Sequence, residues 1–201
     1  MNLNNREAYP EVCIQLLATL KVNLPTHLTY HSLHHTIDVA NVCDMYIEHY
    51  KIDEEYAKLI RIASVGHDFG YIISPENHEE RSIQALSRIL SNNLNPDEIT
   101  LVNAMIRATK VPQAPKSFYE EILADADLDY LGRLDYEELS DCLFKEFQYY
   151  HIVKTEEEWL NLQIQFLENH SYHTTFAQTH RKPQKLRKLK ELKEKRSEFG
   201  Q

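Results

Sequence analysis

Glycine is scarce in this chain, and that scarcity restricts the folds available to it. The 201 residues contain 4 glycines, whereas about 7% is average. Tight β-hairpins depend on glycine-rich turns, so strand-rich folds are disfavoured. Apolar residues instead recur at spacings of three and four, which is typical of amphipathic helices. We expect helices near residues 6–21, 32–50, 54–68, 77–92, 97–109, 118–131, 136–150, 155–169 and 173–196.

The length and composition predict one all-α domain over residues 1–201. Hydrophobic residues make up 42% and charged residues 26% of the chain, which is ordinary for a globular protein. No linker or internal repeat divides it. There is also no apolar run of about 18 residues and no N-terminal signal pattern. The three cysteines stand far apart without a CxxC pair, which disfavours a disulfide framework and a thiolate zinc site. We therefore expect a cytoplasmic protein without a membrane segment.

Charge is distributed unevenly along the chain. The net charge of -9 disfavours nucleic acid as a partner of the whole protein, because phosphate backbones require cationic surfaces. Residues 181–196, however, hold nine Lys or Arg and two Glu. This basic segment could contact nucleic acid or anionic lipid. The interpretation we favour is a C-terminal helix, near 173–197, that lies against an acidic body through Leu186, Leu189 and Leu192.

Three histidines open the second predicted helix. His35 shares a helical face with Val39 and other apolar residues, so we expect it to be buried. His31 lies one turn earlier on the same side, at the mouth above His35. His34 aligns with Asp38 on a polar stripe and should face solvent. A single buried histidine is usually a hydrogen-bonded core residue, so this cluster alone does not indicate a ligand.

A His-Asp pair ends the third predicted helix. His67 and Asp68 follow the apolar run 59–65 and therefore emerge from the core. Burial of both groups is costly unless they are paired or bind a metal ion. Adjacent helical residues point about 100° apart, which suits two ligands of one ion. Taken alone, the dipeptide is equally consistent with a hydrogen bond that closes the helix.

An acidic run near the sixth helix contains one carboxylate that we expect to face inward. Glu121, Asp125 and Asp129 follow one another at four-residue steps, so they predict a solvated stripe. Asp127 instead aligns with Leu123 on the buried side. An inward carboxylate requires a cation nearby.

Two imidazoles and two carboxylates are thus expected to face one helical core: His35, His67, Asp68 and Asp127. Such a mixed nitrogen and oxygen set suits a divalent ion with water in its open positions, with Mn²⁺, Fe²⁺, Mg²⁺, Zn²⁺, Co²⁺ and Ni²⁺ as candidates. The combination is far more specific than any single member.

The order His, His-Asp, Asp resembles the signature of the HD-domain metal-dependent phosphohydrolases. The resemblance spans roughly residues 28–170. Two further stretches look like a bacterial branch of that family, namely His78-Glu79-Glu80-x-Ser82 and the run from Asp125 to Arg133. The element Tyr30-His31-x-x-x-His35 is also similar to cyclic-nucleotide phosphodiesterases, whose first histidine is the general acid. The resemblance implies an all-helical fold, a divalent ion or ion pair, and hydrolysis of a phosphoester.

The resemblance also implies roles for individual residues. His31 would protonate the leaving group, and Asp68 would hold the ion or accept a proton from water. His78 could serve a second ion, although it could equally be a surface residue at a helix N-terminus. Lys110 and Arg133 are candidates for gripping the phosphate, with an ordinary surface cation as the alternative for each.

The sequence therefore predicts a metal-dependent phosphohydrolase that acts on a small phosphorylated substrate, with nucleotides and cyclic nucleotides as the leading class. Two alternatives belong to other classes of protein. One is a catalytically silent, metal-containing HD-type module that senses a nucleotide or binds a protein. The other is a structural helical adaptor that docks through its basic tail. A homodimer is compatible with the sequence, although no exposed apolar stripe specifies one.

Overall fold

The computed structural model describes residues 2–198 and is all-helical over that range. The predicted fold class is therefore confirmed. Contacts along the chain define two compact units, Met1–Asp127 and Leu128–Gln201, and each is described here by itself. The expectation of one domain over residues 1–201 stays a prediction. No described helix is both long enough and apolar enough to cross a membrane.

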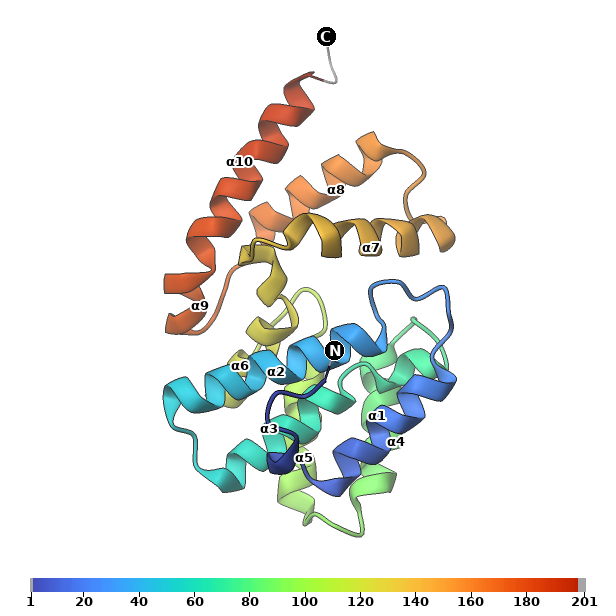
Figure 1. Cartoon of the computed structure of the whole chain (residues 1–201), viewed down its shortest axis with the longest axis vertical. Helices are drawn as coiled ribbons and strands as arrows, with labels where there is room; N and C mark the ends of the chain where they lie inside the picture. The colour runs from blue at the N-terminus through green and yellow to red at the C-terminus, as the bar shows by residue number, and fades with distance from the viewer. Residues whose placement is uncertain (1, 199–201) are drawn as a thin grey trace. The chain divides into compact units, whose positions relative to one another are not determined.

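Unit 1 is built around one central helix (Figure 1). Helix α3 (Glu54–Gly66) is buried continuously from Leu59 to its end. A helix that is buried on all sides must be surrounded by others, and α3 packs against α1, α2, α5 and α6. The remaining elements of unit 1 are η1 (Arg6–Ala8), α1 (Glu11–Asn23), α2 (Leu33–Tyr50), η2 (Phe69–Ile72), α4 (His78–Leu90), α5 (Pro96–Ala108) and α6 (Phe118–Asp127).

Local signals set several helix ends in unit 1. The Asn95 side chain accepts hydrogen bonds at the start of α5, where Glu98 completes a capping box and Pro96 occupies the first turn. Helix α3 ends at Gly66, where an added Cβ would lie 2.1 Å from Leu86 Cδ2. The chain then turns through His67 and Asp68 into the short η2 helix. This ending leaves two polar side chains in the interior.

Unit 2 contains η3 (Asp129–Gly132), α7 (Tyr136–Tyr149), α8 (Glu156–Asn169), α9 (Thr175–His180) and α10 (Lys182–Glu198). Helix α10 packs against α8 and η3 (Figure 1). The single helix predicted near 173–196 is wrong, because the segment is broken at Arg181 into α9 and α10. Gly132 packs against this break so closely that an added Cβ would lie 2.4 Å from the Arg181 carbonyl oxygen.

The solvated acidic stripe predicted through Asp125 and Asp129 is also wrong. Asp125 is buried because α6 is buried continuously from Ile122 to Ala126. Asp129 lies beyond the end of α6, in η3, so the four-residue helical step does not reach it. Its side chain is 1% exposed, and the Arg181 Nε donates to its Oδ1 at 2.7 Å. A buried carboxylate that is paired in this way avoids the cost of an isolated charge.

The basic C-terminal helix packs through lysines rather than through its first leucine. Leu186 is 49% exposed, whereas Lys185 and Lys188 are buried. The Lys185 ammonium donates to the carbonyls of Leu167 and His170 at the end of α8, where helix carbonyls lack intrahelical partners. Long lysine stems can cover apolar surface while the charged group is satisfied at the edge. The expected contact is therefore wrong for Leu186, whereas Leu189 and Leu192 are half-buried.

Candidate metal centre

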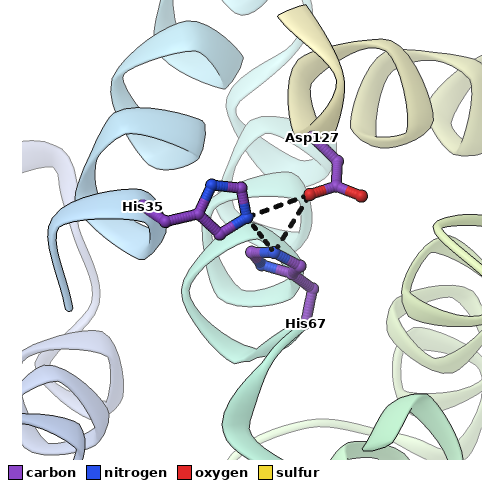
Figure 2. A group of neighbouring side chains, drawn as sticks. All are labelled: His35, His67 and Asp127. Atoms are coloured by element: carbon purple, nitrogen blue, oxygen red, sulfur yellow. Dashed lines mark hydrogen bonds and ion pairs between the residues drawn. The ribbon is translucent and has the colours of Figure 1, made fainter. Parts of the chain in front are cut away.

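Three side chains from three helices of unit 1 meet at one point (Figure 2). His35 comes from the first turn of α2, His67 follows the last residue of α3, and Asp127 ends α6. The Nε2 atoms of the two imidazoles are 3.3 Å apart. Asp127 Oδ1 lies 3.1 Å from His35 Nε2 and 3.4 Å from His67 Nε2. Three potential ligand atoms thus face a common centre.

The orientation of the His67 ring is set by the helix that carries it. Its Nδ1 lies 2.8 Å from the Ser64 carbonyl oxygen, one turn earlier in α3. A carbonyl oxygen can only accept a hydrogen bond, so Nδ1 carries a proton and donates it. In the neutral ring, Nε2 then presents its lone pair toward His35 and Asp127. A hydrogen bond to the second ring nitrogen is the usual way in which proteins orient a metal-binding histidine.

Asp68 adds a carboxylate to the same centre. Its Oδ2 is 3.3 Å from His67 Nε2 and 3.5 Å from His35 Nε2. Over the described part of the chain, this buried oxygen accepts no hydrogen bond. Its other oxygen, Oδ1, lies 3.4 Å from His78 Nε2. Asp68 therefore stands between the three-residue cluster and His78.

The imidazole and carboxylate groups of the centre shift one another's pKa values. Burial lowers the pKa of His67, but the Asp68 and Asp127 carboxylates outweigh it and hold that pKa well above its usual value. Burial raises the pKa of each carboxyl group, yet the neighbouring imidazoles outweigh it and both pKa values lie below their usual range. Without an ion, the His67 imidazole therefore tends to retain its proton, while both carboxyl groups stay charged. A divalent cation would replace that proton.

The donor set fits a divalent ion. Ligand atoms bound at about 2.0–2.2 Å around one ion lie about 3 Å apart, and the donor atoms of His35, His67 and Asp127 are separated by 3.1–3.4 Å. The His35–His67–Asp127 group could thus hold a metal ion, and the buried Asp68 Oδ2 offers a further ligand. Two imidazole nitrogens with carboxylate oxygens suit several first-row metals and do not select one of them.

Ring contacts join His31 and His78 beside the centre. His31 is half-buried before the start of α2, with its ring centroid 5.9 Å from that of His35. His78 begins α4, and its side chain is 18% exposed. The Tyr71 ring is 4.3 Å from the His31 ring and 4.2 Å from the His78 ring. The candidate general acid and the candidate second-ion ligand thus contact one tyrosine, while His34 is exposed as expected.

The two candidate phosphate-binding cations differ in their surroundings. Lys110 is exposed, and its Nζ lies 3.5 Å from Asn77 Oδ1, at the residue before α4. The Lys110 ammonium group therefore lies near the end of α4 that carries His78. Arg133 lies in unit 2, where its guanidinium donates to Asp135 and contacts Asp129. A phosphate-binding role for either residue stays a prediction, and for Arg133 it requires the phosphate to compete with two carboxylates.

Sequence reasoning did not assign roles to Ser64, Tyr71 and Ser82. Ser64 contributes only its backbone carbonyl, so its side-chain identity gave no signal. Ser82 belongs to the stretch that begins at His78, but its contacts cross from α4 to the His67 carbonyl. Tyr71 lies three residues after Asp68, and only that proximity could have drawn attention to it.

Comparisons with models of known protein families, with curated proteins and with solved structures gave no match.

Proposed function

We propose that this chain is a metal-dependent phosphohydrolase of the HD type that hydrolyses a phosphoester of a nucleotide or cyclic nucleotide. The observation that carries the proposal is the convergence of His35, His67 and Asp127 on one centre of unit 1, with Asp68 Oδ2 beside both imidazoles. Buried charges and imidazoles at this density are costly without a cation. Hydrolysis is supported further by His31, which supplies a proton donor next to the centre.

In this proposal, His35, His67, Asp127 and Asp68 hold one divalent ion. When bound, such an ion lowers the pKa of water and neutralises charge on phosphoryl oxygens. One of the two carboxylates accepts a proton from the attacking water. Attack at phosphorus breaks the bond to the ester oxygen, and His31 donates a proton to the departing oxygen. Lys110 is the cation of unit 1 that we assign to the phosphate, because its ammonium group lies beside the residue that precedes α4.

The test measures metal content and hydrolysis in the same preparations. Wild-type protein is loaded separately with Mn²⁺, Mg²⁺, Co²⁺ and Zn²⁺ and assayed on a panel of nucleotides and cyclic nucleotides. We compare it with Asp68→Ala and His35→Ala. The matched control is His34→Ala, because His34 is adjacent to His35 on α2 but exposed. We expect one ion per chain and turnover in the wild type and in His34→Ala, and loss of turnover in the other two.

Two outcomes would contradict the proposal. Stoichiometric metal without turnover of any substrate would favour the alternative of a silent, nucleotide-sensing module. Absence of both metal and turnover would show that these four residues do not form an HD-type centre, and it would favour a structural role for the helical chain.

A further inference from the structure

Tyr71 has no role in the proposed mechanism, yet its ring lies between the rings of His31 and His78. Its ring is stacked on that of His31, with 4.3 Å between centroids and 17° between planes. On its other side it contacts the His78 ring at 4.2 Å, with 34° between planes. Tyr71 itself is 6% exposed, so it is a fixed wall of the site rather than a surface that a substrate could stack upon.

Tyr71 is held by the same turn that carries the His-Asp pair. Its backbone N–H donates to the Asp68 carbonyl at 3.0 Å. The preceding Gly70 N–H donates to Ser82 Oγ, and Ser82 Oγ donates to the His67 carbonyl, each at 2.7 Å. An added Cβ at Gly70 would lie 2.1 Å from the His78 carbonyl oxygen. The short helix η2 is thus held against α4, and this contact fixes the position of the Tyr71 ring relative to Asp68.

His31, by contrast, lacks a helix to set its orientation. It lies in the turn before α2, which begins at Leu33. Its ring is bounded by Tyr30, edge-on at 4.9 Å, and by the parallel face of Tyr71. The Tyr30 ring also contacts the His35 ring, with 4.7 Å between centroids. Stacking on Tyr71 therefore joins the His31 ring to the turn that carries the His-Asp pair.

We propose that Tyr71 is a positioning residue that orients His31 for protonation of the leaving oxygen. This inference rests on the proposed function, in which His31 donates a proton as the phosphorus–oxygen bond breaks. A displacement of about 1 Å can cost about 10²-fold in rate, and a positioned general acid contributes about 10²–10⁴-fold. Loss of the stacked ring should therefore reduce the rate only for leaving groups that need a proton.

The test varies the leaving group. An alkyl ester, such as a nucleoside monophosphate or a cyclic nucleotide that the wild type turns over, leaves as an alkoxide and requires a proton. The corresponding 4-nitrophenyl ester leaves as a stabilised phenolate and does not. For Tyr71→Leu we expect kcat on the alkyl ester to fall about 10²-fold. On the 4-nitrophenyl ester, both KM and kcat should change by less than about threefold. Tyr71→Phe, which keeps the ring, should retain both activities.

Two further measurements separate positioning from general damage. Metal content should be the same in the wild type and in all variants, and the proton resonances of the His31 imidazole should move in Tyr71→Leu but not in Tyr71→Phe, because a stacked ring shifts them. The matched control is Tyr119→Leu, which removes another stacked tyrosine pair of unit 1, between Tyr56 and Tyr119. If Tyr71→Leu fails to fold, Tyr71→Met replaces the ring with a flexible side chain of similar reach.

Each remaining outcome overturns a defined part of this inference. Wild-type turnover combined with an equal loss of kcat on both esters, or with unchanged His31 resonances in Tyr71→Leu, would refute the role of Tyr71 and leave the proposed function standing. No turnover by the wild type on any ester would refute the proposed function and, with it, this role.

Discussion

The two hydrogen bonds that Ser82 makes to the His-Asp turn give the sharpest prediction about the stability of the site. Ser82 is fully buried on α4. Its hydroxyl accepts a hydrogen bond from Gly70 N–H and donates one to the His67 carbonyl, both at 2.7 Å. Ser82→Ala removes both bonds and leaves a buried N–H and a buried carbonyl without this partner. The missing hydroxyl is too small a space to admit a water molecule with several polar partners.

The cost can be estimated from these two bonds. An unsatisfied buried polar group costs about 1–3 kcal/mol, and the carbonyl retains part of its electrostatic environment. Alanine recovers only a few tenths of a kcal/mol through its higher helix propensity. We therefore expect Ser82→Ala to lower the free energy of unfolding by about 2–4 kcal/mol. At about 2–4 °C per kcal/mol for a chain of this size, Tm should fall by roughly 5–15 °C.

The same substitution should weaken metal binding, because the turn that carries His67 and Asp68 loses its anchor. Loss of a residue that orients ligands typically costs about 10–100-fold in metal affinity. Calorimetric and circular-dichroism melting give the stability of the protein, and titration against a competing chelator gives the affinity. The control is Ser87→Ala, on the same helix, whose half-buried hydroxyl bonds to the Asn103 side chain. It should cost less than about 1 kcal/mol.

If Ser82→Ala melted within about 2 °C of Ser87→Ala and bound metal as tightly as the wild type, the anchoring role of Ser82 would be refuted. Such a result would mean that the turn of η2 is held by packing alone, and that the two short hydrogen bonds of Ser82 contribute little to the geometry of the centre.

Three other predictions concern the metal centre and unit 2. His35→Ala should lower affinity for Zn²⁺ or Mn²⁺ at least about tenfold, as measured by chelator competition, while the exposed His34→Ala should leave it unchanged; equal effects would contradict the assigned ligand set. Burial lowers the pKa of His67 and the neighbouring carboxylates raise it by more, so a bound ion must displace a proton. Calorimetry in buffers of different ionisation enthalpy should therefore show proton release near neutral pH. The affinity for the metal ion should rise with pH by up to about tenfold per unit until the raised pKa of His67 is passed. A pH-independent affinity would be inconsistent with this. Gly132→Ala should lower Tm, because its Cβ would lie 2.4 Å from the Arg181 backbone oxygen and overpacking of this kind costs about 1–3 kcal/mol; an unchanged Tm would show that this contact can relax.

Local patterns were sufficient to predict the helical fold and the inward direction of the side chains of the candidate metal centre. Apolar spacing in α2 placed His35 on the buried face and His34 on the exposed one, and both placements are confirmed. The apolar run of α3 likewise predicted that His67 and Asp68 would emerge inside the core, where both are buried. These inferences succeed because each requires only the period of one helix.

The same patterns failed where a helix ended or where a distant residue supplied the compensating charge. Continuation of α6 past Asp127 placed Asp129 on a solvated face, whereas Asp129 is buried against Arg181, 52 residues later. The leucine pattern of α10 gave no sign that Lys185 would be buried at the carbonyl end of α8. A charged group can be buried when its partner is in place, and no short stretch of sequence contains both partners.

By itself, then, the sequence determined the helices and the faces on which its polar residues lie, because both depend on spacing within about four residues. Only the tertiary structure decided that α2, α3 and α6 bring His35, His67 and Asp127 within 3.1–3.4 Å of one another. It also decided that Ser82 clasps the His-Asp turn and that Tyr71 stands against His31. Those contacts join separate elements, and their geometry depends on how the helices pack around α3.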